Sequence, residues 1–318
     1  MRCRRCGEKA VINMHQHRLS LCRAHFLEWL PQQTEHAIEK YGMFTRGERL
    51  LLAVSGGKDS LALWDVLQRL GYQVDGLYIN LGIDENLAYS DQSELIARRF
   101  AQSRQLKLII VDVKGQFGES IPAISLRARH STSRTCSVCG LIKRHIFNQI
   151  ALEQTYDVLL TAHNLDDEAS VLLANTLDWS LARLARGLPM LPAAPGFARK
   201  GKPFCRFYER ETAAYSFLRG IEYMQEECPF ASGSKQLLYK EHINLLEEQM
   251  PGTKLRFFLN YLSAVEKGTF PDQQEADPVL AEKRCPHCGQ PTTTGATCAF
   301  CKLFEKNNPP GNTRGDSS

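Results

Sequence analysis

An unbroken apolar run that ends in two glycines constrains this chain more than any other feature. The run Leu50–Val54 leads into Ser55-Gly56-Gly57-Lys58-Asp59-Ser60, where a helical pattern of apolar residues begins. A continuous apolar run is typical of a strand buried on both faces, as in a parallel sheet. The glycines let the backbone approach a ligand, and the following helix N-terminus offers unpaired N–H groups. The sequence predicts a phosphate site here, but not a Walker loop, because no Gly-x-x-x-x-Gly-Lys-Ser/Thr motif is present.

Apolar runs alternate with amphipathic segments after this loop, which predicts an α/β domain. Strands are expected at residues 73–80, 106–113 and 156–162, and helices at 58–70, 90–104, 139–154 and 165–177. This alternation is typical of a doubly wound parallel sheet, in which ligands bind beyond the carboxyl ends of the strands. Residues 180–202 are expected to leave the sheet, and further helices are expected at 26–40, 210–219, 235–249 and 255–267.

Two sets of paired ligands near the ends of the sequence predict closed tetrahedral zinc sites. The first set is Cys3, Cys6, Cys22 and His25, and the second is Cys285, Cys288, Cys298 and Cys301. Each pair fits on a tight turn, and four protein ligands leave no open position, so both sites are expected to be structural. A knuckle as small as the second cannot bury a core, so zinc would supply its folding energy.

The eleven cysteines also bear on the compartment in which the protein works. No secretory signal and no run of transmembrane length is visible, so a cytoplasmic protein that does not bind membranes is expected. In a reducing compartment, cysteines are more often metal or redox ligands than disulfide partners.

A third cysteine pair and a lone cysteine indicate a further site. Cys136 and Cys139 precede a helix that carries Lys143, and Cys228 precedes a proline. A Cys-x-x-Cys pair at a helix N-terminus has lowered thiol pKa values and can hold a metal, an iron–sulfur cluster or a persulfide. A structural half zinc site for the pair, and simple burial for Cys228, stay open. Cys205 lies in a strand-like run and is expected to be core packing.

An acidic stretch follows the last predicted strand directly. Residues 161–168 include His163, Asp166 and Asp167 at the start of a predicted helix. Acidic residues there are good capping groups, but a magnesium–ATP site would need carboxylates in the same place.

Basic residues are unevenly distributed, although the formal net charge is only +4. Two tracts contain no acid: residues 120–152, with Arg127, Arg129, Arg134, Lys143 and Arg144, and residues 179–208, with Arg183, Arg186, Arg199, Lys200, Lys202 and Arg206. Together they indicate a face for a polyanion, whereas either tract alone could be a solvated surface.

The order of these motifs resembles one family. A Cys/His knuckle, the Ser-Gly-Gly-Lys-Asp-Ser loop, Cys-x-x-Cys-Gly, Thr-x-His-Asn-x-Asp-Asp-Glu, Cys-Pro and an all-cysteine knuckle follow one another. This order is similar to the two-zinc-finger branch of the TtcA/TtuA family of tRNA 2-thiolation enzymes, in the PP-loop ATP-pyrophosphatase superfamily. The resemblance implies zinc knuckles at residues 1–30 and 284–305 that flank a doubly wound PP-loop domain at 31–269. A linker at 270–283 and a disordered tail at 306–318 complete the expected organisation.

The same resemblance implies site residues. ATP, with Mg²⁺, would be bound by Ala53, Ser55, Gly56, Gly57, Lys58, Asp59, Ser60, His163, Asp166 and Asp167. Cys136, Cys139 and Cys228 would hold a 4Fe-4S cluster or carry out persulfide chemistry. Asp59 and Lys143 would be catalytic together with these cysteines.

The implied reaction is chemically coherent. Replacing the C2 oxygen of a uridine by sulfur requires that oxygen to become a leaving group, which adenylation by ATP achieves. Lys58 and the loop N–H groups would stabilise the phosphate charge, and sulfur would then displace AMP. Three rivals stay open: an amidating PP-loop synthetase, a persulfide thiolase without a cluster, and a non-catalytic zinc-knuckle RNA-binding protein.

The target base is not fixed by the motifs. Knuckles at both ends occur in the enzymes that thiolate uridine 54 and in those that act on wobble uridine 34, whereas enzymes of cytidine 32 commonly lack them. The short tail after Lys306 favours uridine 54. The expected partners are tRNA, a ubiquitin-like thiocarboxylate carrier or free sulfide as sulfur donor, and a second copy of the chain in a homodimer.

Overall fold

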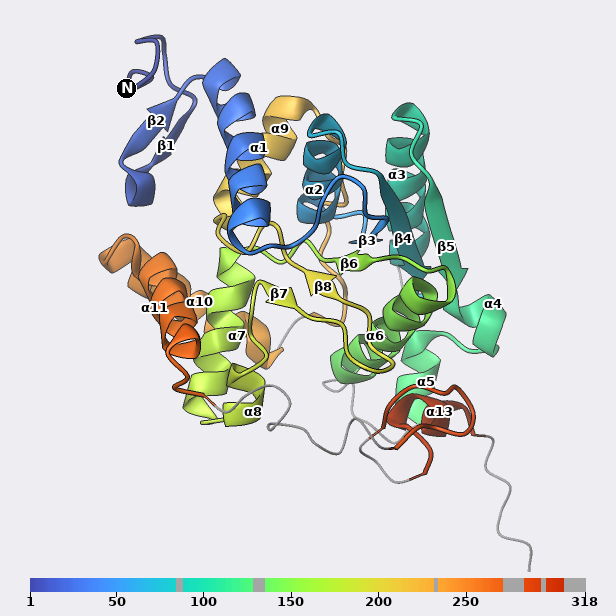
Figure 1. The fold of residues 1–318 in the computed structure, drawn as a ribbon. Coiled ribbons are helices and arrows are strands. Elements are labelled where there is room, and N and C mark those ends of the chain that lie inside the picture. The colour runs from blue at the N-terminus through green and yellow to red at the C-terminus, as the bar shows by residue number, and fades with distance from the viewer. Residues whose placement is uncertain (84–87, 128–134, 232–233, 271–282, 293–295, 306–318) are drawn as a thin grey trace, which may run out of the picture.

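A six-stranded sheet forms the centre of the molecule (Figure 1). The computed structural model describes residues 1–83, 88–127, 135–231, 234–270, 283–292 and 296–305. The strand order is β5-β4-β3-β6-β8-β7, and all pairs are parallel except β7 with β8. The strands are β3 (Leu50–Val54), β4 (Val74–Asn80), β5 (Leu108–Asp112), β6 (Val158–Leu160), β7 (Met190–Leu191) and β8 (Lys200–Gly201).

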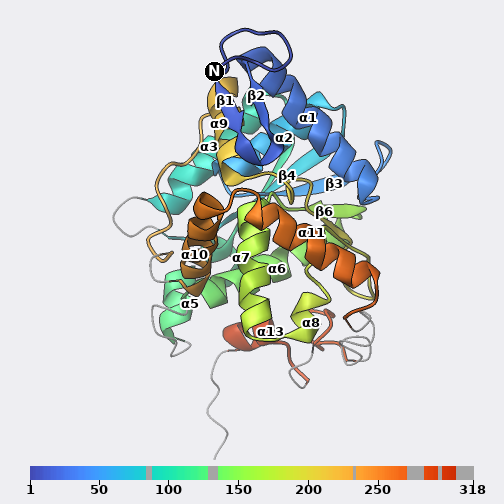
Figure 2. The same cartoon turned by 90° about the vertical axis from the view of Figure 1, so that its left-hand side faces the viewer.

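Helices cover both faces of this sheet. In chain order they are α1 (Arg23–Lys40), α2 (Lys58–Arg69), α3 (Tyr89–Ser103), α4 (Val113–Phe117), α5 (Ile121–Arg127), α6 (Thr135–Glu153), α7 (Leu165–Leu177), α8 (Leu181–Leu184), α9 (Glu209–Arg219), α10 (Lys235–Gln249), α11 (Thr253–Glu266) and α13 (Ala299–Phe304). Figure 1 shows α1, α2, α3 and α9 on one side and α5, α6 and α13 on the other. Helices α10 and α11 pack against α7 (Figure 2).

The alternation of side chains along β3 explains why helices are needed on both faces. Leu50, Leu52 and Val54 belong to the buried cluster that includes residues of α1, α2 and α3, whereas Leu51 belongs to the cluster that includes α5 and α6. A strand that is apolar on both faces must be covered on both. The predicted doubly wound α/β class is therefore confirmed, with β7 as an antiparallel edge.

The chain order places a topological switch point between β3 and β6. From β3 the chain proceeds outward through β4 to β5, and then it returns to β6 on the other side of β3. Ligands of open α/β sheets bind in the crevice that such a reversal leaves beyond the carboxyl ends of the strands.

Some sequence-based expectations for the central region need correction. Helix α6 begins at Thr135, four residues before the predicted start. Residues 180–202 do not simply leave the sheet, because β7 and β8 lie within them and complete it. Strands of two residues carry no apolar run that a pattern could detect. Cys205 lies in a turn rather than a strand, but it is fully buried, as predicted. The predicted linker beyond Phe270 and the predicted disordered tail lie outside the described residues.

Helix α1 passes through Pro31 without a break. Proline has no N–H, so the carbonyl of Leu27, one turn earlier, cannot receive its usual helical hydrogen bond. The guanidinium of Arg69 in α2 donates to that carbonyl instead, at 3.0 Å. Helix α1 also runs across residue 30, where the sequence predicts the boundary between the first knuckle and the PP-loop domain. That domain boundary remains a prediction. None of the described helices is long and apolar enough to cross a bilayer.

The close approach of Trp64 to β4 leads to a stability prediction. A Cβ at Gly76 would overlap the indole ring of Trp64, which is fully buried and donates to the carbonyl of Val74 at 3.0 Å. Gly76→Ala should therefore lower the free energy of unfolding by about 1–3 kcal/mol, measured by urea denaturation. Gly47→Ala is the matched control, because a Cβ at Gly47 meets no atom within 4 Å. Equal stability of the two variants would show that the ring is not held against β4.

Candidate functional site

The turn between β3 and α2 has the geometry of an anion-binding loop. Gly56 has a φ of +75°, and a Cβ there would lie 2.6 Å from the carbonyl oxygen of Ser93, so this position requires glycine. The hydroxyl of Ser60 accepts from the backbone N–H of Ser55 at 3.2 Å and donates to the carbonyl of Gly57 at 3.0 Å. The loop is braced from within, and Gly57, the N-cap of α2, has no side chain to block the N–H groups behind it.

A cavity of about 320 Å³ opens beside this loop. It lies beyond the carboxyl ends of β3, β4 and β6, at the switch point of the sheet. Six residues predicted to bind ATP line it, namely Ala53, Ser55, Asp59, Ser60, His163 and Asp167. Lys143 of α6 and Tyr89 of α3 line it too, whereas Gly56, Gly57, Lys58 and Asp166 lie outside the lining. The fold thus brings most of the predicted nucleotide residues to one cavity.

Lys58 and Asp59 are held by helix α9. The ammonium of Lys58 lies 2.9 Å from Asp59 and 2.6 Å from Glu209, and the hydroxyl of Thr212 donates to Asp59. Burial alone would lower the pKa of Lys58, but the two carboxylates outweigh it and raise that pKa. Lys58 therefore remains a cation in this site.

Glu209 links the loop to α10. Its carboxylate also lies 2.7 Å from the ammonium of Lys240, which in turn lies 2.9 Å from Asp167. Burial opposes the charge of Glu209, yet Lys240 and Lys58 together lower its pKa to about 2. The sequence pattern did not predict roles for Glu209, Thr212 or Lys240. Their contacts with Lys58, Asp59 and Asp167, respectively, each join residues more than seventy positions apart.

The two aspartates of the acidic stretch after β6 have different surroundings. Asp167 forms a reciprocal capping box with Asn164 at the start of α7 and also lines the cavity. Asp166 is buried, lies 2.6 Å from the ammonium of Lys254 and accepts the N–H of Glu209 at 2.9 Å. Asp167 therefore caps α7, as the capping interpretation predicted. Asp166 instead connects α7 to Lys254 and to the start of α9.

The three cysteines predicted to form a sulfur site lie near one another. Cys136 and Cys139 are in the first turns of α6, and the thiol of Cys136 donates to the carbonyl of Phe230 at 3.1 Å, which places the segment after Cys228 beside α6. Among the described residues they do not surround a single point as the two four-ligand sets do. No group of three or more metal ligands within 4.8 Å of one another includes Cys136 or Cys139 in the described part of the chain.

The charges around these thiols correct one expectation. Burial, and then Cys228 and Cys139, raise the pKa of Cys136, whereas Lys143 lowers it. The lowered pKa predicted for a thiol at this helix start is therefore wrong for Cys136. Burial also raises the pKa of Tyr89, with Cys228 and Cys139 as further causes, so Tyr89 lies near both thiols. Because Tyr89 and Lys143 also line the cavity, the cavity adjoins the cysteines.

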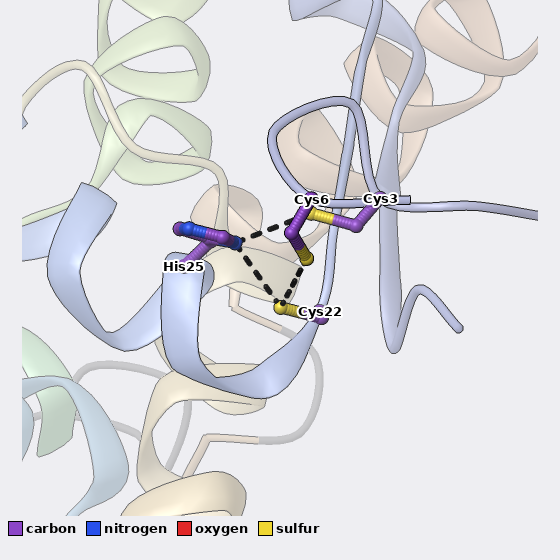
Figure 3. A group of neighbouring side chains, drawn as sticks. All are labelled: Cys3, Cys6, Cys22 and His25. Carbon is purple, nitrogen blue, oxygen red and sulfur yellow. Dashed lines mark hydrogen bonds between the residues drawn. The ribbon is translucent and has the colours of Figure 1, made fainter. Parts of the chain in front are cut away.

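The first predicted zinc set comes together (Figure 3). Its four donor atoms lie within 4.8 Å of one another, with Nδ1 of His25 at 3.4 Å from the sulfur of Cys3 and 3.3 Å from that of Cys22. The sulfurs of Cys6 and Cys22 are 3.7 Å apart. Bonds of about 2.3 Å to one tetrahedral ion separate two sulfurs by roughly 3.8 Å, so this donor set fits zinc.

The hairpin between the ligand pairs docks on α9. It comprises β1 (Ile12–Met14), a 3-10 turn (His15–His17) and β2 (Leu19–Leu21), none of which the sequence predicted. The buried carboxylate of Glu211 accepts from Gln16 at 2.6 Å and lies 3.2 Å from His17. It also accepts the N–H of Tyr208, and so it caps α9 while it anchors the hairpin.

The second zinc set is equally compact. The sulfurs of Cys288 and Cys298 are 3.7 Å apart, and all four donors again lie within 4.8 Å of one another. This knuckle docks on α6, where the ring of His145 stacks on Phe300 at 3.6 Å and the amide of Gln290 donates to the His145 carbonyl at 3.2 Å. Burial lowers the pKa of His145 to about 4, so this ring is neutral near pH 7.

Comparisons with known proteins agree with this architecture. The family model described as the 2-thiouridine synthetase TtuA N-terminal LIM domain matches residues 2–27, and the PP-loop domain model matches residues 30–228. The tRNA-5-methyluridine(54) 2-sulfurtransferase of Thermus thermophilus is 49% identical over 305 residues, which span 96% of this chain and 91% of that protein. The protein of the same name from Pyrococcus horikoshii is 41% identical over 307 residues, 96% and 94% of the two chains.

A solved structure extends the likeness to the fold. The U34-tRNA thiolase NcsA from Methanococcus maripaludis, solved with its 4Fe-4S cluster, matches with a TM-score of 0.74 and 22% identity over 95% of each chain. At that identity the likeness concerns the fold alone. The family assignment rests on the matching models and on the identity along almost the whole sequence. The chain belongs to the TtcA/TtuA family of PP-loop tRNA 2-thiolation enzymes, in the branch with an N-terminal TtuA LIM domain.

Proposed function

We propose that the chain is an ATP-dependent tRNA sulfurtransferase that replaces the C2 oxygen of uridine 54 by sulfur. The observation that carries this proposal is the single cavity that joins Asp59 of the PP-loop to Lys143 and lies beside Cys136, Cys139 and Cys228. An adenylation site and a sulfur site must share access to one base, and the position of the cavity supports such an arrangement. The names of the relatives that are 49% and 41% identical support the choice of uridine 54.

The first half-reaction would take place at the loop. The C2 oxygen attacks the α-phosphorus of ATP, the bond from that phosphorus to the β-phosphate oxygen breaks, and pyrophosphate leaves. The N–H groups at the start of α2 and the cation of Lys58 would stabilise the phosphates. Asp59 and Asp167, which both line the cavity, are the carboxylates best placed to hold Mg²⁺ with the nucleotide.

The second half-reaction would take place at the cysteines. A sulfur nucleophile attacks C2, the C2–O bond breaks, and AMP leaves. Cys136, Cys139 and Cys228 would hold a 4Fe-4S cluster, which, when bound, supplies an iron with an open position for sulfur. Three neighbouring thiols beside a lysine fit that cofactor. Lys143, which lines the cavity, would neutralise charge on the adenylate.

The remaining cofactors and partners belong to this proposal as well. The two compact donor sets would each hold one Zn²⁺. The substrate would be tRNA, and the sulfur donor a thiocarboxylate carrier or sulfide, in the cytoplasm. A homodimer is also proposed, and the exposed Leu238 and Leu245 on α10 offer an apolar face that a second copy could cover.

One alternative has a specific observation in its favour. The NcsA structure that shares this fold is named a U34-tRNA thiolase. Thiolation of wobble uridine 34 is therefore the second candidate, and a persulfide on one of the three cysteines is the alternative to a cluster.

Nucleoside analysis tests the target base. In a strain that lacks this gene, 2-thioribothymidine should disappear from tRNA hydrolysates examined by mass spectrometry. The parent gene should restore it, whereas a Cys228→Ala gene should not. Retention of that nucleoside together with loss of wobble 2-thiouridines would replace uridine 54 by uridine 34.

Metal analysis tests the cysteine assignments. The parent protein should retain two zinc ions through aerobic purification and gain four iron atoms on anaerobic reconstitution, because zinc in closed sites has no redox chemistry. Cys228→Ala should keep the zinc and lose the iron. Cys205→Ala is the matched control, since Cys205 is buried in the core and should leave both metals unchanged. Full iron content in Cys228→Ala would remove that residue from the site.

The ion pairs around the loop lead to a prediction for adenylation. Asp59→Asn should lower AMP formation at least about 100-fold, because it removes a carboxylate from the cavity while keeping the side-chain volume. Zinc content and tRNA affinity should not change. Asp178→Asn, at an exposed position after α7, serves as the control. Parental AMP formation by Asp59→Asn would contradict the role given to this residue.

A further inference from the structure

A row of alternating charges lies behind the cavity beside the PP-loop. In spatial order it runs Asp59, Lys58, Glu209, Lys240 and Asp167, and each neighbouring pair lies no more than 2.9 Å apart. These residues come from α2, α9, α10 and α7, so only the fold brings them together. The two aspartates at the ends of the row line the cavity, whereas the three residues between them do not.

The aspartates at both ends are held in a defined orientation. Asp59 accepts from its neighbouring ammonium with one oxygen and from the hydroxyl of Thr212 with the other. Asp167 likewise accepts from an ammonium with one oxygen, and from the N–H of Asn164 with the other, at 3.2 Å. An ionised carboxylate has about four lone-pair sites, so two donors leave each aspartate with sites for a cation.

Glu209 is the member of the row that contacts both lysines. Lys58 lies 2.6 Å from Glu209 and 2.9 Å from Asp59. Lys240 lies 2.7 Å from Glu209 and 2.9 Å from Asp167. Both ammoniums are therefore nearer to the central carboxylate than to the aspartates of the cavity.

Glu209 does not join the aspartates as a third metal ligand. Throughout the described ranges, the sets of three or more ligand atoms that lie within 4.8 Å of one another contain no carboxylate. The lysines stand between Glu209 and each aspartate. Any effect of Glu209 on the cavity is therefore transmitted by the two ammoniums.

The helices that carry these lysines are fixed in place. Lys58 is the first residue of α2, and α10, which carries Lys240, packs on α7 (Figure 2). The amide of Gln236 on α10 donates to the hydroxyl of Ser170 on α7 at 2.6 Å. The ammoniums can thus change partners only by moving their side chains. A cation that binds the aspartates displaces both ammoniums from them, and Glu209 remains as the partner of both.

Stability alone does not account for the row. Partly buried ion pairs contribute little net stability, because the cost of removing the charges from water offsets their attraction. An acidic residue at the first position of α9 favours the helix dipole, but that role needs no contact with two lysines. Three carboxylates against two ammoniums leave the row with a net charge of −1, which favours a cation in the cavity.

We propose that Glu209 is a positioning residue for the metal-bound nucleotide. It holds Lys58 and Lys240 so that Asp59 and Asp167 remain available to Mg²⁺. Groups that orient the ligands of a metal typically contribute about 10–100-fold to its affinity. The inference rests on the proposed function for the nucleotide, and it adds a residue that is not itself in the cavity.

Calorimetric titration of the full-length protein with α,β-methylene-ATP, which cannot release pyrophosphate, tests this role without turnover. With Mg²⁺, Glu209→Gln should weaken binding about 10-fold or more, because both ammoniums then turn to the aspartates. In EDTA the same variant should bind no more weakly than the parent, since a negative charge near the phosphates has been removed. Glu222→Gln, at a 69% exposed side chain after α9, is the charge-matched control and should bind as the parent does under both conditions.

Two further variants separate positioning from a general structural role. Glu209→Asp, which keeps the charge, should bind the Mg²⁺ complex more tightly than Glu209→Gln does. The double variant Glu209→Gln/Lys240→Met should also bind it more tightly than Glu209→Gln, because the ammonium released by the first change is absent. Two purely structural defects would instead add, and the double variant would bind more weakly.

The outcomes distinguish this inference from the proposed function. If the parent binds the Mg²⁺ complex, the inference alone is wrong when Glu209→Gln keeps the parental affinity or loses it equally with and without Mg²⁺. A double variant weaker than Glu209→Gln would also overturn it. A parent that does not bind the Mg²⁺ complex would remove the adenylation step of the proposed function, and this inference with it.

Discussion

A buried ionic contact between α2 and α9 determines how the loop of the site is held. Asp65 on α2 is 1% exposed and accepts from the hydroxyl of Tyr215 at 2.7 Å and from Arg219 at 2.9 and 3.0 Å. Burial opposes its ionisation, but Arg219 and Tyr215 keep the pKa of Asp65 low. A buried charge left without its partner costs about 3–5 kcal/mol, so the two helices are strongly joined. The first turns of the same helices supply the Lys58–Glu209 and Thr212–Asp59 contacts, which makes the loop part of a rigid pair.

The knuckle that contains Cys285, Cys288, Cys298 and Cys301 holds α6 in a comparable way. It contacts this helix through His145 and Phe300, and Arg127 of α5 donates to the carbonyl of Leu303 at 2.6 Å. Cys136, Cys139 and Lys143 lie in the amino-terminal half of the same helix, before His145. The packing of the knuckle against the middle of α6 limits the freedom of the turns that carry Cys136 and Cys139.

The sequence alone predicts those parts of the fold and the site whose residues are adjacent in the chain. The strand, the glycine turn and each metal-ligand pair occupy a few adjacent residues, so their spacing alone predicted them. Glu209, Lys240 and Lys254 reach the site only through tertiary packing, and their surroundings in the sequence read as ordinary helix starts and surface charges. Two-residue strands such as β8 likewise lack any periodic signal. Asp166 and Asp167 looked equivalent in the sequence, and only the partners of each, Lys254 for one and the cavity for the other, distinguish them.

The docking of the first hairpin on Glu211 has a consequence for the order in which the chain assembles. Gln16 and Glu211 are 195 positions apart, whereas the ligands of the first knuckle fall within one short stretch. Local closure is fast and distant closure is slow, because loop entropy must be lost before a remote contact forms. During synthesis the amino end emerges first, so the four ligands of this knuckle can come together before α9 has been made. The hairpin is then already closed when Glu211 becomes able to accept from Gln16 and to dock it on α9.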